Sequence, residues 1–223
     1  MFRFLTRLVI WFLAISIGLT LVYRFVPPPV TITMIADPNG ITKDWTPLSR
    51  IDRNMVGAVI GGEDGKFCSH NGFDQEAIET AIKRNAAGGS GLRGGSTISQ
   101  QTAKNVFLWQ GWGWDRWLRK GLEAWFTLLI ETLWDKRRIM EVYLNVAETG
   151  IGTYGVEAGA HRYFGKSAAR LSTQEAARMA AALPSPKKRS VKAPKGFTLR
   201  YGNTIAARIG VVRRDGLDAC VYE

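Results

Sequence analysis

The chain has 223 residues, a formal net charge of +11 and a pI near 10.0. This length leaves room for one soluble domain beside the single apolar segment at the N-terminus. The basic excess favours an anionic partner, either nucleic acid, an acidic lipid surface or a phosphorylated substrate, and charge alone does not choose among them. Cys68 and Cys220 form no CxxC or metal-ligand spacing, so we expect two buried free thiols rather than a bridge.

The N-terminal segment is an anchor candidate. Residues 8–23, LVIWFLAISIGLTLVY, carry no charge and lie between Arg7 and Arg24. They are fewer than the roughly 20 residues that span a bilayer, but the flanking arginines can snorkel and apolar neighbours extend the stretch, which predicts a transmembrane anchor over 8–26. A cleaved signal peptide is the alternative, although no small-x-small site follows. Arg3 and Arg7 predict a cytoplasmic N-terminus, residues 1–7, with the remaining chain outside.

The rest of the chain divides into a spacer and one domain. The prolines at 27–29 begin a stiff spacer over 27–46, with a predicted strand at 30–35 and a turn at 37–40. Beyond it, periodicity and capping signals predict helices over 52–63, 75–87, 97–108, 118–146, 156–163 and 172–183. Ser172 and Glu175 form a capping box at the start of the last one. We therefore expect a mostly α single domain over 47–223.

Acidic residues gather at the end of the first predicted helix of this domain. Glu63, Asp64, His70 and Asp74 lie within one short segment after an apolar helical stretch. Because a carboxylate at a helix C-terminus opposes the helix dipole, its placement there hints at function. An ordinary polar loop is the alternative. A metal site on Cys68 and His70 matches no common spacing.

A glycine-rich segment precedes the helix predicted at 97–108. Gly95 stands where a phosphate-binding loop needs lysine, so residues 88–96 predict a mobile loop and not a nucleotide site. Thr97 and Gln100 form a capping box, and helical spacing puts Thr97, Gln101 and Lys104 on one face. A hydroxyl, an amide and an ammonium together suit an oxygen-rich anionic ligand, whereas a solvated face would look the same.

Three further patterns each allow more than one interpretation. Arg119 and Glu123 are spaced as a helical ion pair, either structural or catalytic. The four tryptophans within 106–117 favour a membrane interface over a buried aromatic cluster. The last forty residues are rich in lysine and arginine, which favours a solvated face near acidic lipid headgroups over a substrate site, and nucleic-acid binding least.

Four ordered segments, with a continuation, together resemble the peptidoglycan glycosyltransferase family, in particular its monofunctional biosynthetic transglycosylases. They are Glu63-Asp64-x-x-Phe67-x-x-His70-x-Gly72-Phe73-Asp74, Gly94-Gly95-Ser96-Thr97-Ile98-x-Gln100-Gln101-x-x-Lys104-Asn105, Arg119-Lys120-x-x-Glu123, Lys136-x-x-Ile139-Met140-Glu141-x-Tyr143-Leu144-Asn145, and Tyr154-Gly155-Val156-Glu157-Ala158 through Tyr163-Phe164-Gly165-Lys166. The resemblance covers about residues 47–186. Gly61 and Gly62 depart from the expected bulkier or more polar residues.

The resemblance implies a lysozyme-like, mostly α fold and polymerisation of lipid II by inverting β-1,4 glycosyl transfer with release of undecaprenyl diphosphate. By similarity Glu63 is the base on the acceptor hydroxyl, Lys104 and Arg119 neutralise the leaving pyrophosphate, and Glu123 orients these groups or holds a divalent cation, Mg²⁺ or Mn²⁺. The implied substrate-binding residues are Asp64, Phe67, His70, Ser96, Thr97, Gln100, Gln101, Lys104, Asn105, Arg119, Lys120, Glu141 and Asn145.

The implied surroundings are a bacterial inner membrane crossed once, a periplasmic catalytic domain, a growing glycan chain, a cell-wall synthesis complex and no nucleic acid. Ser185-Pro186-Lys187-Lys188 has a Ser-x-x-Lys pattern but no accompanying Lys-Thr-Gly segment, so we expect a loop and no transpeptidase activity. The rival hypotheses are a lytic transglycosylase or lysozyme-like hydrolase, and a non-catalytic membrane-tethered scaffold.

Overall fold

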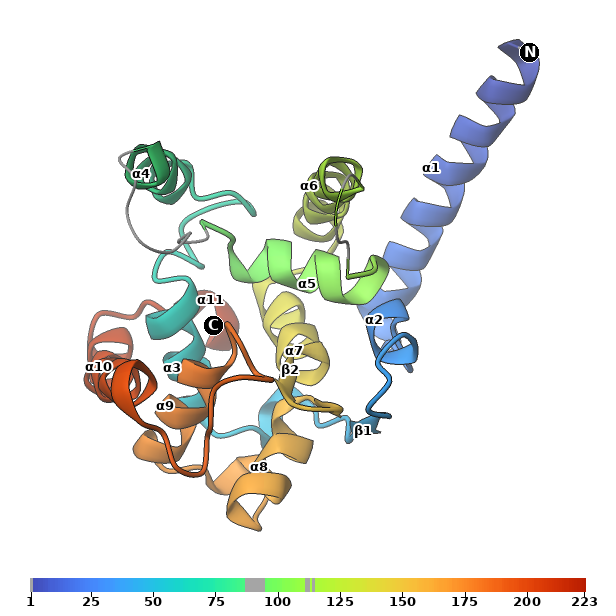
Figure 1. Cartoon of the computed structure of the whole chain (residues 1–223). Coiled ribbons are helices and arrows are strands. Elements are labelled where there is room, and N and C mark those ends of the chain that lie inside the picture. Colours follow the sequence, from blue (N-terminus) through green and yellow to red (C-terminus); the bar gives the residue numbers. More distant parts are fainter. Residues whose placement is uncertain (1, 87–94, 111–112, 114) are drawn as a thin grey trace.

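The computed structural model describes residues 2–86, 95–110, 113 and 115–223. Helices make up most of this part of the chain, which confirms the mostly α class (Figure 1). They are α1 (Phe2–Phe25), α2 (Ile32–Ile35), α3 (Arg53–Glu63), α4 (Gln75–Ala86), α5 (Ile98–Phe107), α6 (Arg116–Leu133), α7 (Lys136–Val146), α8 (Val156–Phe164), α9 (Thr173–Ala182), α10 (Gly196–Arg214) and α11 (Ala219–Tyr222), with 3-10 turns at Leu48–Arg50 and Ala168–Arg170.

A small sheet supports the helices at one side. Its strands are β1 (Thr42–Lys43), β2 (Glu148–Gly150) and β3 (Thr153–Tyr154), in the order β1-β3-β2. β1 and β3 are parallel, whereas β2 and β3 are antiparallel with an irregularity between Glu148 and Gly150. The sheet therefore ties the segment after α2 to the connection between α7 and α8.

The local capping signals are confirmed. The Thr97 and Ser172 side chains accept from the backbone N–H of Gln100 and Glu175, whose side chains accept in return, so both capping boxes are closed. The turn at 37–40 is also present, because the Gly40 N–H donates to the Asp37 carbonyl at 3.3 Å. These signals act within one turn, so their outcome depends little on tertiary packing.

Two predictions about elements are wrong, and one helix was not predicted. Residues 32–35 form α2 and not a strand, because Thr31 caps the N–H of Met34 and this turn packs on α5. The helix predicted over 118–146 is two helices: Trp134 is extended, and the Asp135 side chain accepts from the Arg138 N–H to begin α7. The helix that was not predicted is α10 in the basic C-terminal region, whose Ile205, Ile209 and Val212 are buried.

Two groups of helices make the body of the molecule. α3, α9 and α10 pack together in its lower part in Figure 1, while α5 lies against α6 and α7 above them. The alanines of α9, residues 176, 177 and 180–182, are buried and allow this close packing. The end of α3 and the start of α5 consequently approach each other between the two groups of helices. Several of the predicted site residues lie at this approach.

The departures at Gly61 and Gly62 have a packing reason. A Cβ at Gly61 would lie 3.0 Å from the Cβ of Arg208, and one at Gly62 would lie 2.9 Å from the Ile205 side chain, both on α10. The Arg208 guanidinium donates to the Gly61 carbonyl at 2.8 Å, and the Tyr201 hydroxyl donates to the Gly62 carbonyl. These glycines let α10 approach and hold the last turn of α3.

α1 is, among the described residues, the one helix long and apolar enough to cross a membrane, over Arg3–Phe25 with a mean hydropathy of 2.1. Only 11% of its most apolar window is buried, unlike a core helix, which fits a membrane anchor. Its lower end is docked on the domain: the Trp125 indole N–H donates to Ser16 Oγ at 3.2 Å, and that of Trp134 to the Thr20 carbonyl at 2.8 Å. Arg138 donates to the carbonyls of Tyr23 and Val26.

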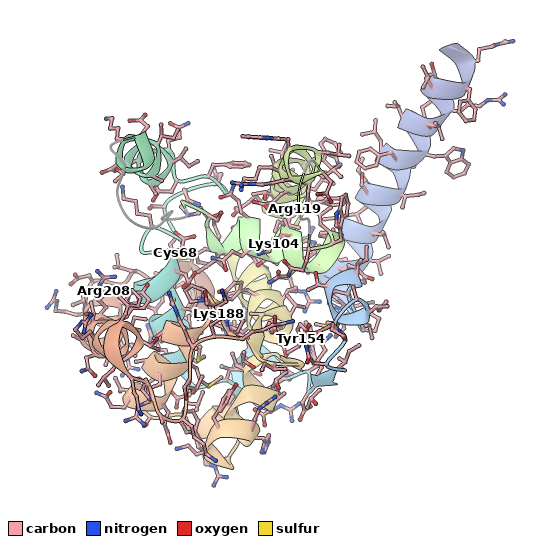
Figure 2. The ribbon with its side chains drawn as sticks, in the orientation of Figure 1. Cys68, Lys104, Arg119, Tyr154, Lys188 and Arg208 are labelled. Carbon is pink, nitrogen blue, oxygen red and sulfur yellow. A yellow bond between two sulfur atoms is a disulfide. The ribbon has the colours of Figure 1, made fainter. Side chains whose placement is uncertain are left out.

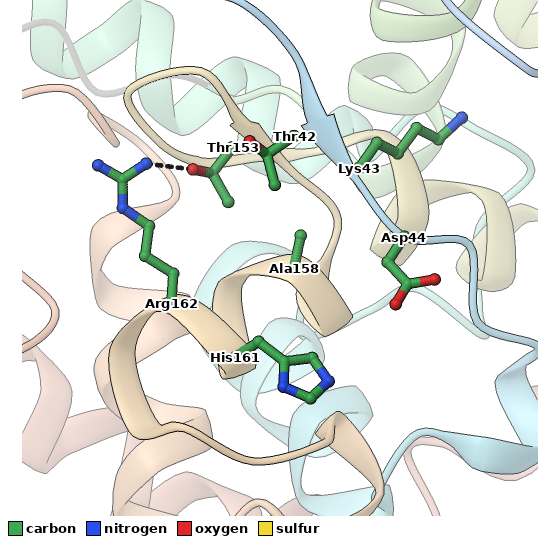
Figure 3. Close-up of a pocket in the computed structure, with 7 residues that line it drawn as sticks. All are labelled: Thr42, Lys43, Asp44, Thr153, Ala158, His161 and Arg162. Carbon is green, nitrogen blue, oxygen red and sulfur yellow. Dashed lines mark hydrogen bonds between the residues drawn. The ribbon is translucent and has the colours of Figure 1, made fainter.

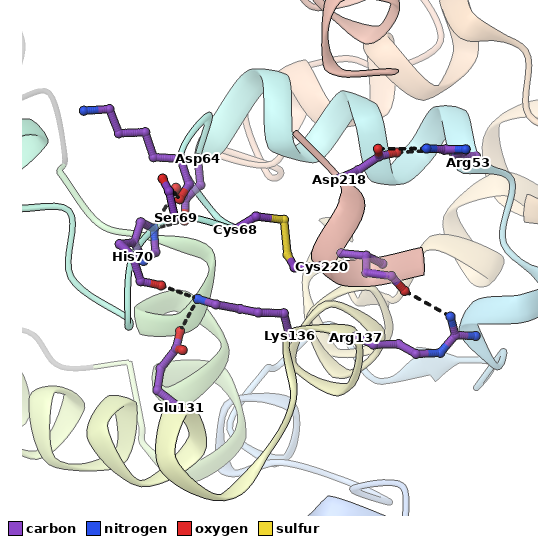
Figure 4. The surroundings of a disulfide bond; sticks show 12 residues. Arg53, Asp64, Cys68, Ser69, His70, Glu131, Lys136, Arg137, Asp218 and Cys220 are labelled. Carbon is purple, nitrogen blue, oxygen red and sulfur yellow. Dashed lines mark hydrogen bonds and ion pairs between the residues drawn. A yellow bond between two sulfur atoms is a disulfide. The ribbon is translucent and has the colours of Figure 1, made fainter. Parts of the chain in front are cut away.

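The expectation of two free thiols is wrong, because Cys68 and Cys220 form a disulfide across a sequence separation of 152 residues. Spacing could not reveal it, since only the fold brings α11 beside the segment after α3 (Figure 4). Such bonds form in oxidising compartments and are rare in the cytosol. The bond therefore supports placing the domain outside the cytoplasm.

We expect the double variant Cys68→Ser, Cys220→Ser to lose stability, because the bond closes a long loop in the unfolded chain. The free energy of unfolding should fall by about 2–5 kcal/mol. Denaturant titration of the full chain in detergent measures this. Reduced wild type should reproduce the variant, and equal midpoints for the oxidised and reduced proteins would contradict the prediction.

Candidate active site

The end of α3 and the start of α5 are joined through Asp64. Its carboxylate accepts from the Ile98 N–H at 2.9 Å and faces His70 Nε2 at 3.0 Å. His70 Nδ1 accepts from the Gly72 N–H at 3.1 Å, so Nε2 carries the proton that points to Asp64. A carboxylate at the first N–H of α5 also complements the helix dipole. Asp64 and His70 thus fix where Glu63 stands relative to α5.

The first turn of α5 is locked to the same segment. The Thr97 hydroxyl donates to the Gly72 carbonyl at 2.7 Å, and the Thr97 N–H donates to the Gln100 side chain at 3.1 Å. Phe67 is fully buried, with the Lys136 ammonium 4.6 Å from its ring centre. Thr97, Gln100 and Phe67 therefore hold the backbone, and Ser96 lies directly before this capped turn.

Glu63 is partly buried at the C-terminal end of α3. Its Oε2 accepts from the Gln101 amide at 3.0 Å, and the Tyr143 hydroxyl donates to Gln101 Oε1 at 3.4 Å. Burial raises the pKa of the Glu63 carboxyl above its usual value, although the Gln101 hydrogen bond and the charges of Arg189 and Lys104 partly offset this. A raised pKa makes this carboxylate a better proton acceptor near neutral pH.

Two cations, Lys104 of α5 and Arg119 of α6, lie on helices that pack against each other (Figure 2), and Arg119 brings a second carboxylate, Glu123, to this part of the site. Arg119 Nη1 donates to Glu123 at 3.2 Å, and Lys120 pairs with the other Glu123 oxygen. Burial lowers the pKa of Lys104. The negative charges of Glu123 and Glu63 raise this pKa, whereas the positive charges of Arg119 and Lys120 lower it. Lys104 thus lies within the electrostatic reach of both carboxylates.

One hydrogen-bond donor of the Arg119 guanidinium is not used in its contact with Glu123. Its Nε is buried and has no hydrogen-bond partner among the residues that the structure describes. An unsatisfied buried donor is costly unless a ligand completes it. Together with the buried ammonium of Lys104, it makes this corner of the site suited to an anion with several oxygens.

A pocket of about 680 Å³ opens beside these groups. It extends from α5 past the end of α7 to the turn that follows α9. Its walls are Thr33, Ala36, Asp37, Pro38, Gln101, Lys104, Asn105, Trp109, Gln110, Tyr143, Ala147, Glu148, Tyr154, Leu183, Pro184, Ser185, Pro186, Lys187 and Lys188. The structure thereby brings the predicted residues Gln101, Lys104 and Asn105 to one cavity.

Two predicted binding residues lie elsewhere. Glu141 accepts from the Leu48 N–H at 2.9 Å and pairs with Arg138, while Asn145 is fully buried and exchanges hydrogen bonds with the Thr46 backbone at 2.8 and 2.9 Å. Both therefore hold residues 46–48 on α7. Their role in substrate binding stays a prediction.

The sequence interpretation missed several pocket residues. The sequence favours a solvated face over a substrate site for Lys187 and Lys188, yet both line the pocket, and Lys187 contacts Asp37 at 2.9 Å and Glu148 at 3.6 Å. Arg189, also in the basic tail, lowers the pKa of Glu63. The prolines at 184 and 186 were the available signal, because they force a turn directly after the buried α9.

Two predictions on local segments fall wholly or partly outside the described residues. Residues 87–94 hold most of the predicted glycine-rich loop, and Trp112 and Trp114 belong to the predicted interface cluster. Of the other tryptophans in that cluster, Trp109 is half-buried and donates to Asp115 at 2.7 Å, whereas Trp117 is 80% exposed. Of the two tryptophans of this cluster that the structure describes, Trp117 is the one exposed enough to meet a membrane interface.

Glu123 is not in the group of metal-ligand side chains found among the described residues. That group is Asp44, Glu157 and His161, whose ligand atoms lie within 4.8 Å of one another. Figure 3 shows Asp44 and His161 at a separate surface pocket lined by β1 and α8. Both Glu123 oxygens already accept from cations, so this side chain does not fit a divalent cation as it stands.

We expect Gln101→Ala to move the acidic limb of the rate profile to higher pH. The amide stabilises the ionised Glu63, so its removal raises the pKa of that carboxyl further. The dependence of kcat/KM on pH reports this value for the free enzyme. Thr102→Ala, at a buried position of the same helix, is the control. A limb that stays in place or moves to lower pH would contradict the assignment.

Comparisons with known proteins identify the family of the chain. A family model described as Transglycosylase matches residues 31–209. The biosynthetic peptidoglycan transglycosylase of Caulobacter vibrioides is 52% identical over 204 residues, covering 90% of this chain and 87% of that protein. Those of Rhodospirillum centenum and Pseudomonas aeruginosa are each 50% identical, covering 93% and 87% of this chain and 90% and 86% of their own. The chain therefore belongs to the transglycosylase family, the peptidoglycan glycosyltransferases that its sequence motifs resemble.

Proposed function

We propose that this peptidoglycan glycosyltransferase polymerises lipid II into linear glycan strands, with Glu63 as the base. The observation that carries the proposal is the pocket that Gln101 and Lys104 line together on α5, because Gln101 holds the Glu63 carboxylate at 3.0 Å beside it. A proton acceptor, Glu63, and an anion-binding group, Lys104, therefore belong to one site. That pairing suits transfer of a sugar from a pyrophosphate.

On the acceptor side, Glu63 takes the proton of the 4-hydroxyl of an N-acetylglucosamine as its oxygen attacks the donor's anomeric carbon. Gln101 holds the carboxylate in place, and Tyr143 holds Gln101. Because the attack comes from the face opposite the leaving group, the configuration inverts and a β-1,4 bond forms. General-base help of this kind contributes about 10²- to 10⁴-fold.

On the donor side, the bond to the lipid pyrophosphate breaks and its electron pair leaves with the oxygen. Lys104 and the free Nε of Arg119 neutralise this charge, while Glu123 holds Arg119 and Lys120 in position. The proposed mechanism uses no metal at Glu123, whose oxygens are engaged by these cations. Lys187 and Lys188, at the far end of the pocket, offer further contacts to anionic parts of the substrate.

The anchor limits where this reaction takes place. We assign residues 1–7 to the cytoplasm, 8–26 to the bacterial inner membrane, 27–46 to the spacer and 47–223 to a periplasmic catalytic domain. The apolar α1, its docking on Trp125 and Trp134, and the disulfide support this orientation. The exposed Trp117 and Leu118 of α6 add an apolar surface suited to the lipid interface.

We propose polymerisation without peptide cross-linking. Ser185 and Lys188 lie in a turn that lines the glycosyl-transfer pocket, with the Lys188 N–H donating to the Ser185 carbonyl at 3.0 Å. A growing glycan chain is the second substrate, and association with a cell-wall synthesis complex is a proposal that rests on the family alone. Nucleic acid has no place in this scheme.

The test is incubation of the full chain in detergent with labelled lipid II. The expected product is polymer that a muramidase digests, with undecaprenyl diphosphate released in equal amount. Preformed glycan is offered in a parallel reaction. Cleavage of that glycan without polymer would show a hydrolase. If the protein neither formed polymer nor cleaved glycan, the result would favour the scaffold hypothesis.

A further inference from the structure

The last residues of the chain hold α3 and the segment beyond it. Arg53, at the start of α3, donates through Nε and Nη2 to the two oxygens of Asp218 at 2.8 and 2.9 Å. Beyond the other end of α3, Cys68 is bonded to Cys220 (Figure 4). We call residues 218–223 the C-terminal latch.

α7 provides a third attachment. Arg137 Nη1 donates to the Val221 carbonyl at 3.0 Å, and the side chains of Val221 and Asp218 are each 1% exposed. The neighbouring Lys136 donates to the His70 carbonyl at 2.6 Å. The latch is therefore packed into the molecule, and α7 holds both it and the segment that carries His70.

The segment between Glu63 and His70 needs such support. It is a series of turns, with the Phe67 N–H donating to the Asp64 carbonyl at 3.2 Å and the Ser69 N–H to the Lys66 carbonyl at 2.8 Å. These bonds shape the turns, and the two ends of the segment are attached to other elements, Asp64 to the Ile98 N–H of α5 and the His70 carbonyl to Lys136 of α7. Cys68 lies between the paired Asp64 and His70, so the disulfide fixes the middle of the segment to the latch.

We propose that the C-terminal latch is a positioning element for Glu63, and that the Cys68–Cys220 bond closes it. The proposal rests on the proposed role of Glu63 as the base. Closure removes two protons and two electrons from the two thiols and joins their sulfurs. The oxidant is a protein disulfide of the exchange class, which accepts both electrons and becomes a dithiol. Full activity therefore follows export from the reducing cytoplasm.

The reason is geometric. Glu63 contributes only while its carboxylate stays aligned with the acceptor hydroxyl, and a displacement of about 1 Å in an active site can cost on the order of 10²-fold in rate. An open latch frees Cys68 and lets the Asp64–His70 pair move. Lys104 and Arg119 on α5 and α6 are not attached to the latch, so substrate binding should change less than turnover.

The experiment compares oxidised full-length enzyme with the same preparation reduced and alkylated with iodoacetamide, below the melting temperature of the reduced form. We expect kcat on lipid II to fall about tenfold or more, with KM changed less than threefold. Water reaching Glu63 should also lower the pKa of its carboxyl and move the acidic limb of kcat to lower pH; the charges of Lys104 and Arg189 act in the same direction, and that of Asp64 opposes it. A merely structural bond would not move this limb.

Two variants complete the test. The double variant Cys68→Ser, Cys220→Ser should have the kcat of the reduced wild-type enzyme, whether or not reductant is present. Arg53→Met should also lower kcat, although its Cys68–Cys220 bond stays intact. The proposal would be overturned if the oxidised and reduced enzymes had the same kcat and the same acidic limb in the pH dependence of kcat. Mass spectrometry must show two alkylated cysteines in the reduced sample for this comparison. An active Glu63→Gln enzyme would instead refute the base assignment, whatever the ratio of oxidised to reduced rates.

Discussion

Glu63→Gln should lower the rate of lipid II polymerisation by about 10²- to 10⁴-fold, because glutamine keeps the shape of the side chain but cannot take the acceptor proton. The amide can still hydrogen-bond Gln101, so the fold and substrate binding should persist. The measurement is kcat with full-length enzyme in detergent. KM should stay within a few-fold of wild type.

Its matched control is Glu79→Gln, the same exchange at an exposed position of α4 whose nearest ion pair is with Lys83 at 4.0 Å. That variant should keep the wild-type kcat. A Glu63→Gln enzyme with near wild-type turnover would mean that another group takes the proton. The melting temperature of each variant separates loss of chemistry from loss of folding.

The sequence predicted the parts of the fold that local chemistry decides. The starts of α3, α5 and α9 follow from the N-capping side chains of Asp52, Thr97 and Ser172. It also supplied the candidate base and its cationic neighbours, because their residue types and order are a family pattern. Arg119 does contact Glu123, as their helical spacing implied. The contact between Gln101 and Glu63 depends on the approach of α5 to the end of α3, which spacing does not reveal.

What the sequence did not predict depends on tertiary contact. α10 looks like a basic tail because its mean hydropathy is low, and only its packing on α3 and α9 shows which side is buried. The same holds for Cys220, which reaches Cys68 through the turn after α10. Lys187 and Lys188 likewise look like any surface lysines until the fold turns them into the pocket.

The two halves of the proposed mechanism depend on each other through charge. Lys104 lowers the pKa of Glu63, and Glu63 raises that of Lys104. Each therefore helps to keep the other ionised despite burial. In the proposed reaction, the bound pyrophosphate would also attract the Lys104 ammonium, and this would weaken the stabilisation of the ionised Glu63 by that ammonium. The base is then a better proton acceptor at the moment when both substrates are present.

Lys104→Met tests this coupling. Methionine keeps most of the length of lysine and removes the charge, so the leaving pyrophosphate loses one of its two buried cations. We expect kcat to fall by about 10²- to 10³-fold, the range seen when one electrostatic stabiliser of a transition state is removed. Loss of the positive charge should also raise the pKa of Glu63, moving the acidic limb of the profile to higher pH.

Lys192→Met, at an exposed position of the basic C-terminal region, is the control for the loss of one positive charge from the molecule. It should leave both kcat and the acidic limb unchanged. If Lys104→Met lowered kcat without moving the limb, the ammonium would act on the leaving group alone. If the limb moved without a large loss of rate, Arg119 would carry the pyrophosphate by itself, because its unpaired Nε is the other buried donor in this corner.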